Sequence, residues 1–195
     1  MSKRRHYRIT EEDVSDLRER TRGQVSFDNY SKWVKRVAEL DPLIYEITEA
    51  FQGITLGDGI GLLEANGIDD RASAAERAEL RSRDEKTDWR KIDAKLLNYC
   101  NASPAYFDAR GFWFHLPAFL IAELNDDYYL DFVEPMISDL QVHREWNDLL
   151  TQPQRTVITK TLELLRDYPD FMELETEIVV GIERLQNLAD ETTDQ

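Results

Sequence analysis

Residues 150–165, LTQPQRTVITKTLELL, decide the fold class of this chain. Thr151 and Gln154 stand at the spacing of a capping box, in which two side chains satisfy backbone N–H groups that the first turn of a helix leaves without partners. Apolar residues then recur every three or four positions, so they fall on one face of a helix. These apolar positions are Val157, Ile158, Leu162 and Leu165. The stretch therefore predicts an amphipathic helix with one buried stripe.

The same periodicity recurs on both sides of this stretch. Downstream, the segment 170–189 carries apolar residues at spacings of three and four, which favours a last, packed helix. Upstream, residues that commonly cap helices precede the periodic runs: Thr10, Ser26, Asp41, Asp58, Ser73 and Asp93. No run alternates for long enough to require a sheet. We therefore predict an all-α chain folded as a single irregular or orthogonal multi-helix bundle.

One short segment departs from the helical periodicity. In GFWFHLP, alternation would place Phe112 and Phe114 on one side of a strand and Trp113 and His115 on the other. Pro117 disfavours helix in the residue before it and suits the first turn of the helix that follows. We therefore predict a short extended piece near 111–116.

Charge divides the 195-residue chain into two parts. Residues 1–36 carry 10 basic and 6 acidic side chains, whereas residues 37–195 carry 14 basic and 33 acidic ones. We predict a basic N-terminal arm and helix over 1–36, with residues 1–9 as a loose arm, and an acidic all-helical domain over 37–195. The total formal charge of −15 repels nucleic acid and anionic lipid and favours a basic protein partner.

Several other features bear on the compartment and on cofactors. Cys100 is the single cysteine, so neither an internal disulfide nor a cysteine-rich zinc site is expected. The N-terminus does not resemble a signal peptide, and the longest apolar run, at 111–122, is too short to span a bilayer. GDGIG at 57–61 lacks the spacing of a phosphate-binding loop. We expect a cytoplasmic protein without a membrane segment and without a cofactor.

From about residue 43 to 165 the chain resembles an uncharacterised bacterial family that is classed only as a domain of unknown function. The resemblance is carried by IxEAF-like residues at 47–51, LGDGIGLLEANGIDD at 56–70, DEKTDW at 84–89, SPAYFDARGFWFHLPAFL at 103–120 and the closing stretch 150–165. The first 36 residues lie outside it. The family has no established activity, so the resemblance implies a domain boundary and a set of residues to examine, but no reaction.

Two of these motifs hold the candidate site residues. Asp84, Asp88 and Trp89 belong to DEKTDW, and Trp113 and His115 belong to the aromatic run. If the two motifs meet in space, the aromatic side chains could bind a ligand and His115 could exchange a proton with it. The alternative is structural: a histidine satisfied in the core, tryptophans in packing, and aspartates as caps.

Carboxylates also raise the question of a metal site. Asp69, Asp70 and Asp84 could supply oxygen ligands to a hard cation such as Mg²⁺ or Ca²⁺. Their spacing matches no known metal-binding loop, and each could equally serve as a cap or turn residue.

Three functions remain open at this stage. The leading hypothesis is a non-enzymatic interaction protein that binds or regulates a basic partner, for which an immunity protein against a toxin is a concrete form. The alternative is an enzyme, dependent on a small molecule or a metal, with its site around Asp84, Asp88, Trp89, Trp113 and His115. The third is a homo-oligomer that assembles through the apolar C-terminal helix.

Overall fold

The computed structural model describes residues 6–21, 28–142 and 145–191, and every regular element in these ranges is helical. The all-α prediction is therefore confirmed for the described part of the chain. The α-helices are, in chain order, α1 (Glu11–Thr21), α2 (Asp28–Arg36), α3 (Leu40–Ala50), α4 (Leu62–Asp69), α5 (Ala74–Arg83), α6 (Ala94–Tyr99), α7 (Ala109–Leu124), α8 (Val133–Val142), α9 (Gln152–Leu165) and α10 (Glu175–Glu191). Short 3-10 helices connect several of them, at Val37–Glu39, Trp89–Lys91, Ser103–Tyr106, Asn147–Leu149 and Pro169–Leu174.

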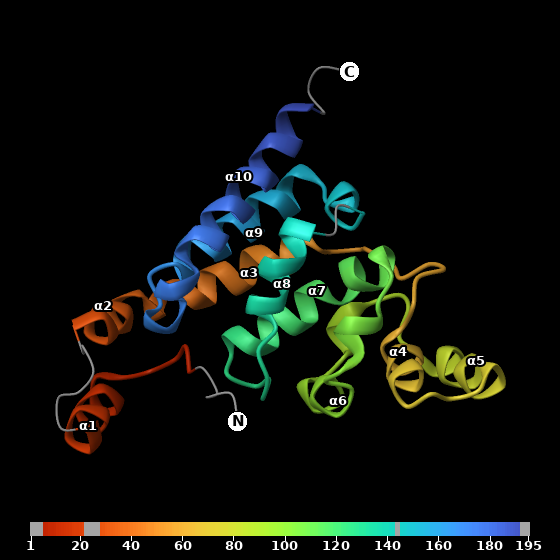
Figure 1. The fold of residues 1–195 in the computed structure, drawn as a ribbon, viewed down its shortest axis with the longest axis horizontal. Coiled ribbons are helices and arrows are strands. Elements are labelled where there is room, and N and C mark those ends of the chain that lie inside the picture. Colours follow the sequence, from red (N-terminus) through yellow and green to blue (C-terminus); the bar gives the residue numbers. More distant parts are fainter. Residues whose placement is uncertain (1–5, 22–27, 143–144, 192–195) are drawn as a thin grey trace.

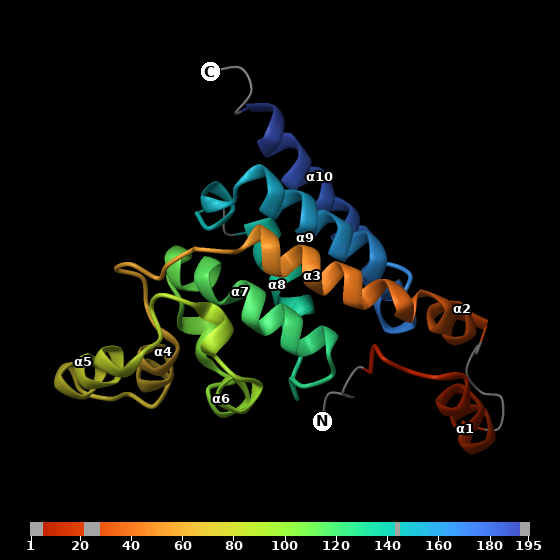
Figure 2. The same cartoon turned by 180° about the vertical axis from the view of Figure 1, so that it is seen from behind.

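Helices α3, α9 and α10 lie side by side and form one layer of the bundle (Figures 1 and 2). Helix α7 packs against α3 and lies below it in Figures 1 and 2, and α8 packs against α10. The pair α4 and α5 lies at one end of the long axis, and α1 and α2 lie at the other. The layer formed by α3, α9 and α10 thus spans the middle of an irregular helical array.

Helix α9 forms as its sequence predicts. Thr151 and Gln154 form the capping box, and Pro153 lies in the first turn, where its missing N–H costs nothing. The apolar stripe of α9 is buried against its neighbours: Val157, Ile158, Leu162 and Leu165 are each at most 3% exposed. Burial of this face, at about 25 cal/mol per Å² of apolar surface, accounts for much of what holds the layer together.

The extended piece predicted near 111–116 is wrong, because α7 runs through it without a break. Most side chains of α7 are buried on every side of the helix, from Phe112 to Leu124. A helix buried all round shows no polar face, so neither its helical period nor its contrast with a strand is visible in the sequence. Pro117 lies inside the helix rather than at the start of a new one.

Two predicted helix starts also differ from the structure. Helix α3 begins at Leu40, so Asp41 lies in its first turn instead of capping it. Helix α4 begins at Leu62, and the side chain of Asp58 is almost fully exposed, with an ion pair to Arg110. Ser26, the predicted cap of the second helix, lies outside the described residues.

Residues 6–9 are packed rather than loose, which corrects the expectation of a free arm at these positions. Tyr7 is fully buried and belongs to the same hydrophobic core as Trp33 of α2 and Phe119 of α7. The charge boundary near residue 36 is therefore crossed by the core. No described helix is both long and apolar enough to cross a membrane.

Candidate functional site

Asp84 acts as a cap for a helix that is distant in sequence. Its two carboxylate oxygens accept hydrogen bonds from the backbone N–H groups of Leu63 (2.7 Å) and Glu64 (3.2 Å) at the start of α4. Burial raises the pKa of Asp84, while these two N–H groups favour the charged form. A Cβ atom on Gly61 would lie 2.1 Å from a carboxylate oxygen of Asp84. The glycine in LGDGIG and the aspartate in DEKTDW are therefore matched to each other.

Asp88 and Trp89 likewise hold a turn in place. The carboxylate of Asp88 accepts from the backbone N–H of Arg90 and pairs with its guanidinium, and this pairing lowers the pKa of Asp88. Trp89 is 5% exposed, and its indole Nε1–H donates to the carbonyl of Phe51 at 2.8 Å. The bond joins the DEKTDW turn to the end of α3.

His115 is enclosed by aromatic rings. Its ring stacks on Phe107 at a centroid distance of 4.5 Å and meets Phe114 edge to face. Nδ1 lies 2.7 Å from the carbonyl oxygen of Gly111; since a carbonyl only accepts, Nδ1 carries the proton in the neutral ring. Burial lowers the pKa of His115 to about 4. At 1% exposure the imidazole is neutral at pH 7 and closed off from solvent in this conformation.

Trp113 lies on the opposite side of α7 and is half-buried. Its indole Nε1–H donates to the side-chain oxygen of Gln154 at 3.1 Å. The same oxygen accepts from the backbone N–H of Thr151, so Trp113 also supports the capping box of α9. The structure thus gives Trp89, Trp113 and His115 separate partners on three different neighbours, Phe51, Gln154 and Gly111.

The three metal candidates also have separate partners. Asp69 accepts from the hydroxyl of Tyr106 at 2.8 Å, and Asp70 accepts from the amide of Asn66 at 2.9 Å. Asp84 caps α4, as described above. Among the described residues, no three His, Cys, Asp or Glu side chains converge as a metal site requires.

A hollow of about 490 Å³ opens between α3 and α9, and we call it the tyrosine hollow. Its lining consists of Tyr45, Glu46, Glu49, Ala50, Gln152, Pro153, Thr156 and Val157. Tyr45 is 66% exposed at its edge, and Glu49, one helical turn further along α3, is also exposed. Ala50 and Val157 give it an apolar floor. The tyrosine hollow is therefore an apolar depression with an aromatic side chain and two carboxylates on the α3 side.

A second hollow, of about 420 Å³, continues along the same seam between α3 and α9. Its lining includes Pro42, Leu43, Leu164, and the acids Glu39 and Glu163. Glu46 belongs to both hollows and pairs with Lys160 of α9 at 2.5 Å. This exposed ion pair crosses the seam and divides the two hollows.

Sequence reasoning did not single out Tyr45 or the glutamates beside it. The tyrosine hollow exists because α3 and α9, whose residues Glu46 and Lys160 are 114 positions apart, pack with their apolar stripes inward and leave Tyr45 outside. One signal was present: in α3, Leu43 and Ile47 mark the buried face, and Tyr45 lies off that face. An aromatic residue on the polar side of an amphipathic helix indicates an exposed anchor.

The comparisons with known proteins identify a family of unknown function. No curated protein and no solved structure matches the chain. One family model matches residues 39–184, a range that contains the whole of the resemblance at 43–165 and both hollows apart from Arg36 and Ala38. By this match, the chain belongs to the family of unknown function DUF6714.

Proposed function

We propose that this protein is a non-enzymatic interaction module that holds a basic, partly apolar segment of a partner protein in the tyrosine hollow. The observation that carries the proposal is Tyr45, a large aromatic side chain left 66% exposed beside an apolar floor. Tyrosine is enriched among the residues that dominate binding energy at protein interfaces, because one rigid ring buries much area at low entropic cost.

Charge favours a basic partner over an acidic one. Glu46 and Glu49 flank Tyr45, and Glu39 and Glu163 lie along the second hollow. The whole chain carries 39 acidic against 24 basic residues, so its long-range field attracts cationic surfaces and speeds their encounter. Lys160 and Arg36 pair with two of these carboxylates, those of Glu46 and Glu39. Glu49 and Glu163 therefore supply the excess negative charge along the two hollows.

The biological setting of this proposal is a cytoplasmic regulator or an immunity protein that neutralises a basic toxin. The surroundings of the residues considered above for catalysis support a non-catalytic role. His115 is enclosed, and the carboxylates of Asp84 and Asp88 accept hydrogen bonds from backbone N–H groups. Support for a reducing compartment comes from Cys100, which is buried and is the single cysteine of the chain.

A selection of random peptides displayed on phage, against the folded full-length chain, tests the proposal. We expect the selected peptides to combine Lys or Arg with an aromatic or branched aliphatic residue. The Tyr45→Ala variant should bind such a peptide about tenfold or more weakly, which corresponds to a hot-spot loss of about 1.4 kcal/mol or more.

The matched control is Tyr99→Ala, which removes another tyrosine, 73% exposed, at the end of α6. We expect this variant to bind the peptide as the unmodified chain does. Enrichment of acidic peptides, or equal losses with Tyr45→Ala and Tyr99→Ala, would contradict the proposal. A stable dimer in light scattering that Tyr45→Ala dissociates would assign the tyrosine hollow to self-assembly instead.

A further inference from the structure

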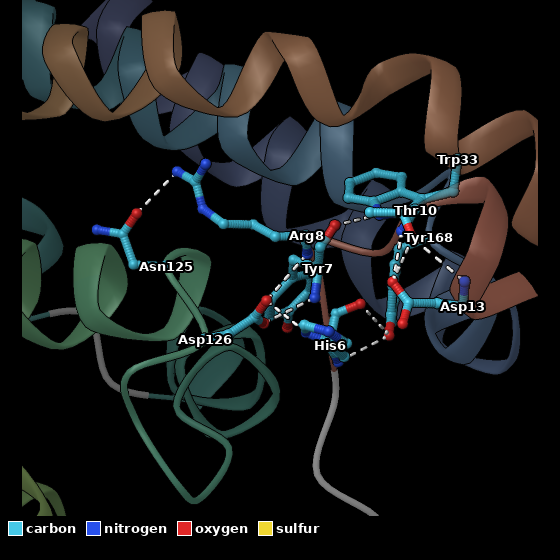
Figure 3. A network of polar contacts seen from close by, with 9 residues as sticks. All are labelled: His6, Tyr7, Arg8, Thr10, Asp13, Trp33, Asn125, Asp126 and Tyr168. Carbon is cyan, nitrogen blue, oxygen red and sulfur yellow. Dashed lines mark hydrogen bonds and ion pairs between the residues drawn. The ribbon is translucent and has the colours of Figure 1, made fainter.

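Residues 6–9 cross the surface of the family domain as a short strap, and Figure 3 shows its contacts. The carboxylate of Asp126 accepts three hydrogen bonds from the strap: from the backbone N–H of Tyr7 (2.7 Å), from the backbone N–H of Arg8 (3.0 Å) and from Nδ1–H of His6 (2.5 Å). The guanidinium of Arg8 donates to Asn125 and to Asp41. A basic segment is thus held by an acidic corner of the domain.

Tyr7 anchors the strap in an aromatic cage. Its ring is fully buried and lies 4.8 Å from the ring centroid of Tyr168 and 6.3 Å from that of Phe171. Its hydroxyl donates to Glu123 at 2.7 Å, and its carbonyl accepts from the indole of Trp33 at 2.7 Å. The strap therefore combines one deep aromatic anchor with charged contacts on either side, as a bound peptide does.

Asp126 is an unexpected residue at its position. It has a φ of +62° immediately after α7, where the backbone bonds from Asp126 N–H to Glu123 and from Asp127 N–H to Ala122 form a Schellman motif. Glycine or asparagine is usual there, because a left-handed conformation strains other residues. A carboxylate at a helix C-terminus also meets the negative end of the helix dipole. Both costs are offset by the N–H groups of the strap.

The strap and its site lie on different sides of the family boundary. Asp41, Glu123, Asp126 and Tyr168 all fall within the matched range 39–184, whereas residues 6–9 do not. Helix α1 follows the strap, and among its described side chains Val14 and Leu17 pack against the core. Val14 is the one described side chain of α1 that is buried, and a cavity of about 180 Å³ remains between α1, Tyr30 and Tyr168.

From this geometry we propose that the corner formed by Asp41, Glu123, Asn125, Asp126 and Tyr168 is a peptide-binding site, separate from the tyrosine hollow, and that residues 6–9 occupy it as a displaceable internal ligand. The external ligand it fits is a protein segment in which a tyrosine is followed by an arginine. Such a segment can reproduce the anchor at Glu123, the backbone bonds to Asp126 and the guanidinium contact to Asn125. The strap then regulates access, because a tethered ligand competes at a high effective concentration.

A labelled synthetic peptide with the sequence of residues 3–10, KRRHYRIT, tests this proposal on the full-length chain. In the Tyr7→Ala variant the internal ligand loses its anchor, so we expect saturable binding of the peptide, about tenfold or more tighter than to the unmodified chain. A peptide in which the tyrosine is replaced by alanine should not bind. The double variant Tyr7→Ala with Asp126→Asn should bind weakly, although asparagine suits the left-handed backbone at least as well.

Failure of KRRHYRIT to bind a Tyr7→Ala chain that retains its helical circular dichroism would overturn the proposal. If Tyr7→Ala does not fold, hydrogen exchange of the unmodified chain decides the question. We expect the amides of Tyr7 and Arg8 to exchange through local opening, faster than the amides of α7. If these amides exchange only when the whole chain unfolds, residues 6–9 do not leave their site in the folded protein, and the proposal is overturned. A dimer that Tyr7→Ala abolishes would overturn it too, because the strap would then be exchanged between two copies.

Discussion

The burial of His115 makes the stability of the folded chain depend on pH. The unfolded chain takes up a proton on this residue as the pH falls through about 6.5, whereas in the folded chain burial lowers its pKa to about 4. The free energy of unfolding therefore falls as the pH is lowered through this window, by an amount on the order of 3 kcal/mol for the full shift. Asp and Glu side chains generally take up protons at the acidic end of this pH range. The contribution of His115 is therefore measured as the difference between the unmodified chain and a variant that lacks this histidine.

We predict that His115→Phe flattens the pH dependence of unfolding between pH 6.5 and pH 4 relative to the unmodified chain. The measurement is urea unfolding at a series of pH values, followed by tryptophan fluorescence. At pH 7 the variant should lose about 1 kcal/mol, because the hydrogen bond to Gly111 is removed. Parallel pH profiles for the two chains would show that His115 titrates normally and that its enclosure is incomplete.

Gly61 tests the fit between segments 56–70 and 84–89, which meet where Gly61 faces Asp84. A methyl group at this position meets the Asp84 carboxylate, which cannot move away without giving up its bonds to α4. We expect Gly61→Ala to destabilise the chain by about 1–3 kcal/mol, as overpacking does. In the control Gly53→Ala nothing lies within 4 Å of the added carbon, so only its left-handed backbone (φ +76°) contributes, with a smaller loss of about 1 kcal/mol. The order of the two losses is measured by chemical unfolding.

Among the elements, α4 depends on a cap from outside its own sequence. The N-cap residue of α4, Gly61, offers no side chain, and Asp84 supplies the acceptor instead. We predict that Asp84→Ala costs about 2 kcal/mol of stability, since it leaves two backbone N–H groups without acceptors. Asp84→Asn, which keeps one acceptor oxygen, should cost less. Thermal unfolding by circular dichroism ranks the two variants, and an equal loss in both would contradict the capping role.

The elements also show how much the sequence alone could predict. The capping box at Thr151 and Gln154 is confirmed. It could be predicted because its two residues are only three positions apart, so their spacing is visible in the sequence. The helix through His115 was missed because burial on all sides removes the polar face that periodicity needs. The cap at Asp84 joins residues 20 positions apart, and the hydrogen bond from Tyr7 to Glu123 joins residues 116 positions apart. No local pattern encodes such contacts. The hypothesis that Asp84, Trp89, Trp113 and His115 form a site remains untested by any activity, although each side chain has a structural partner.

Across the protein, the excess of acidic residues weakens folding and strengthens the binding of basic partners. Repulsion among 39 carboxylates, offset by 24 cations, destabilises the folded chain, and salt screens this repulsion. We predict that raising sodium chloride from about 0.05 M to about 0.5 M increases the melting temperature and weakens the binding of a basic peptide about tenfold or more. Scanning calorimetry and fluorescence anisotropy measure the two effects. A peptide affinity that does not change with salt would contradict the proposal that charge attraction contributes to binding.

We propose that α3 and α9 together form the surface that holds a basic partner segment. Chemical-shift mapping locates this surface residue by residue, with a selected basic peptide titrated into the isotopically labelled full-length chain. We predict that the largest shifts fall on Tyr45, Glu49, Gln152 and Thr156, on both sides of the tyrosine hollow. Shifts that concentrate elsewhere, such as around Tyr99 at the end of α6, or that spread evenly over the acidic surface, would contradict the claim.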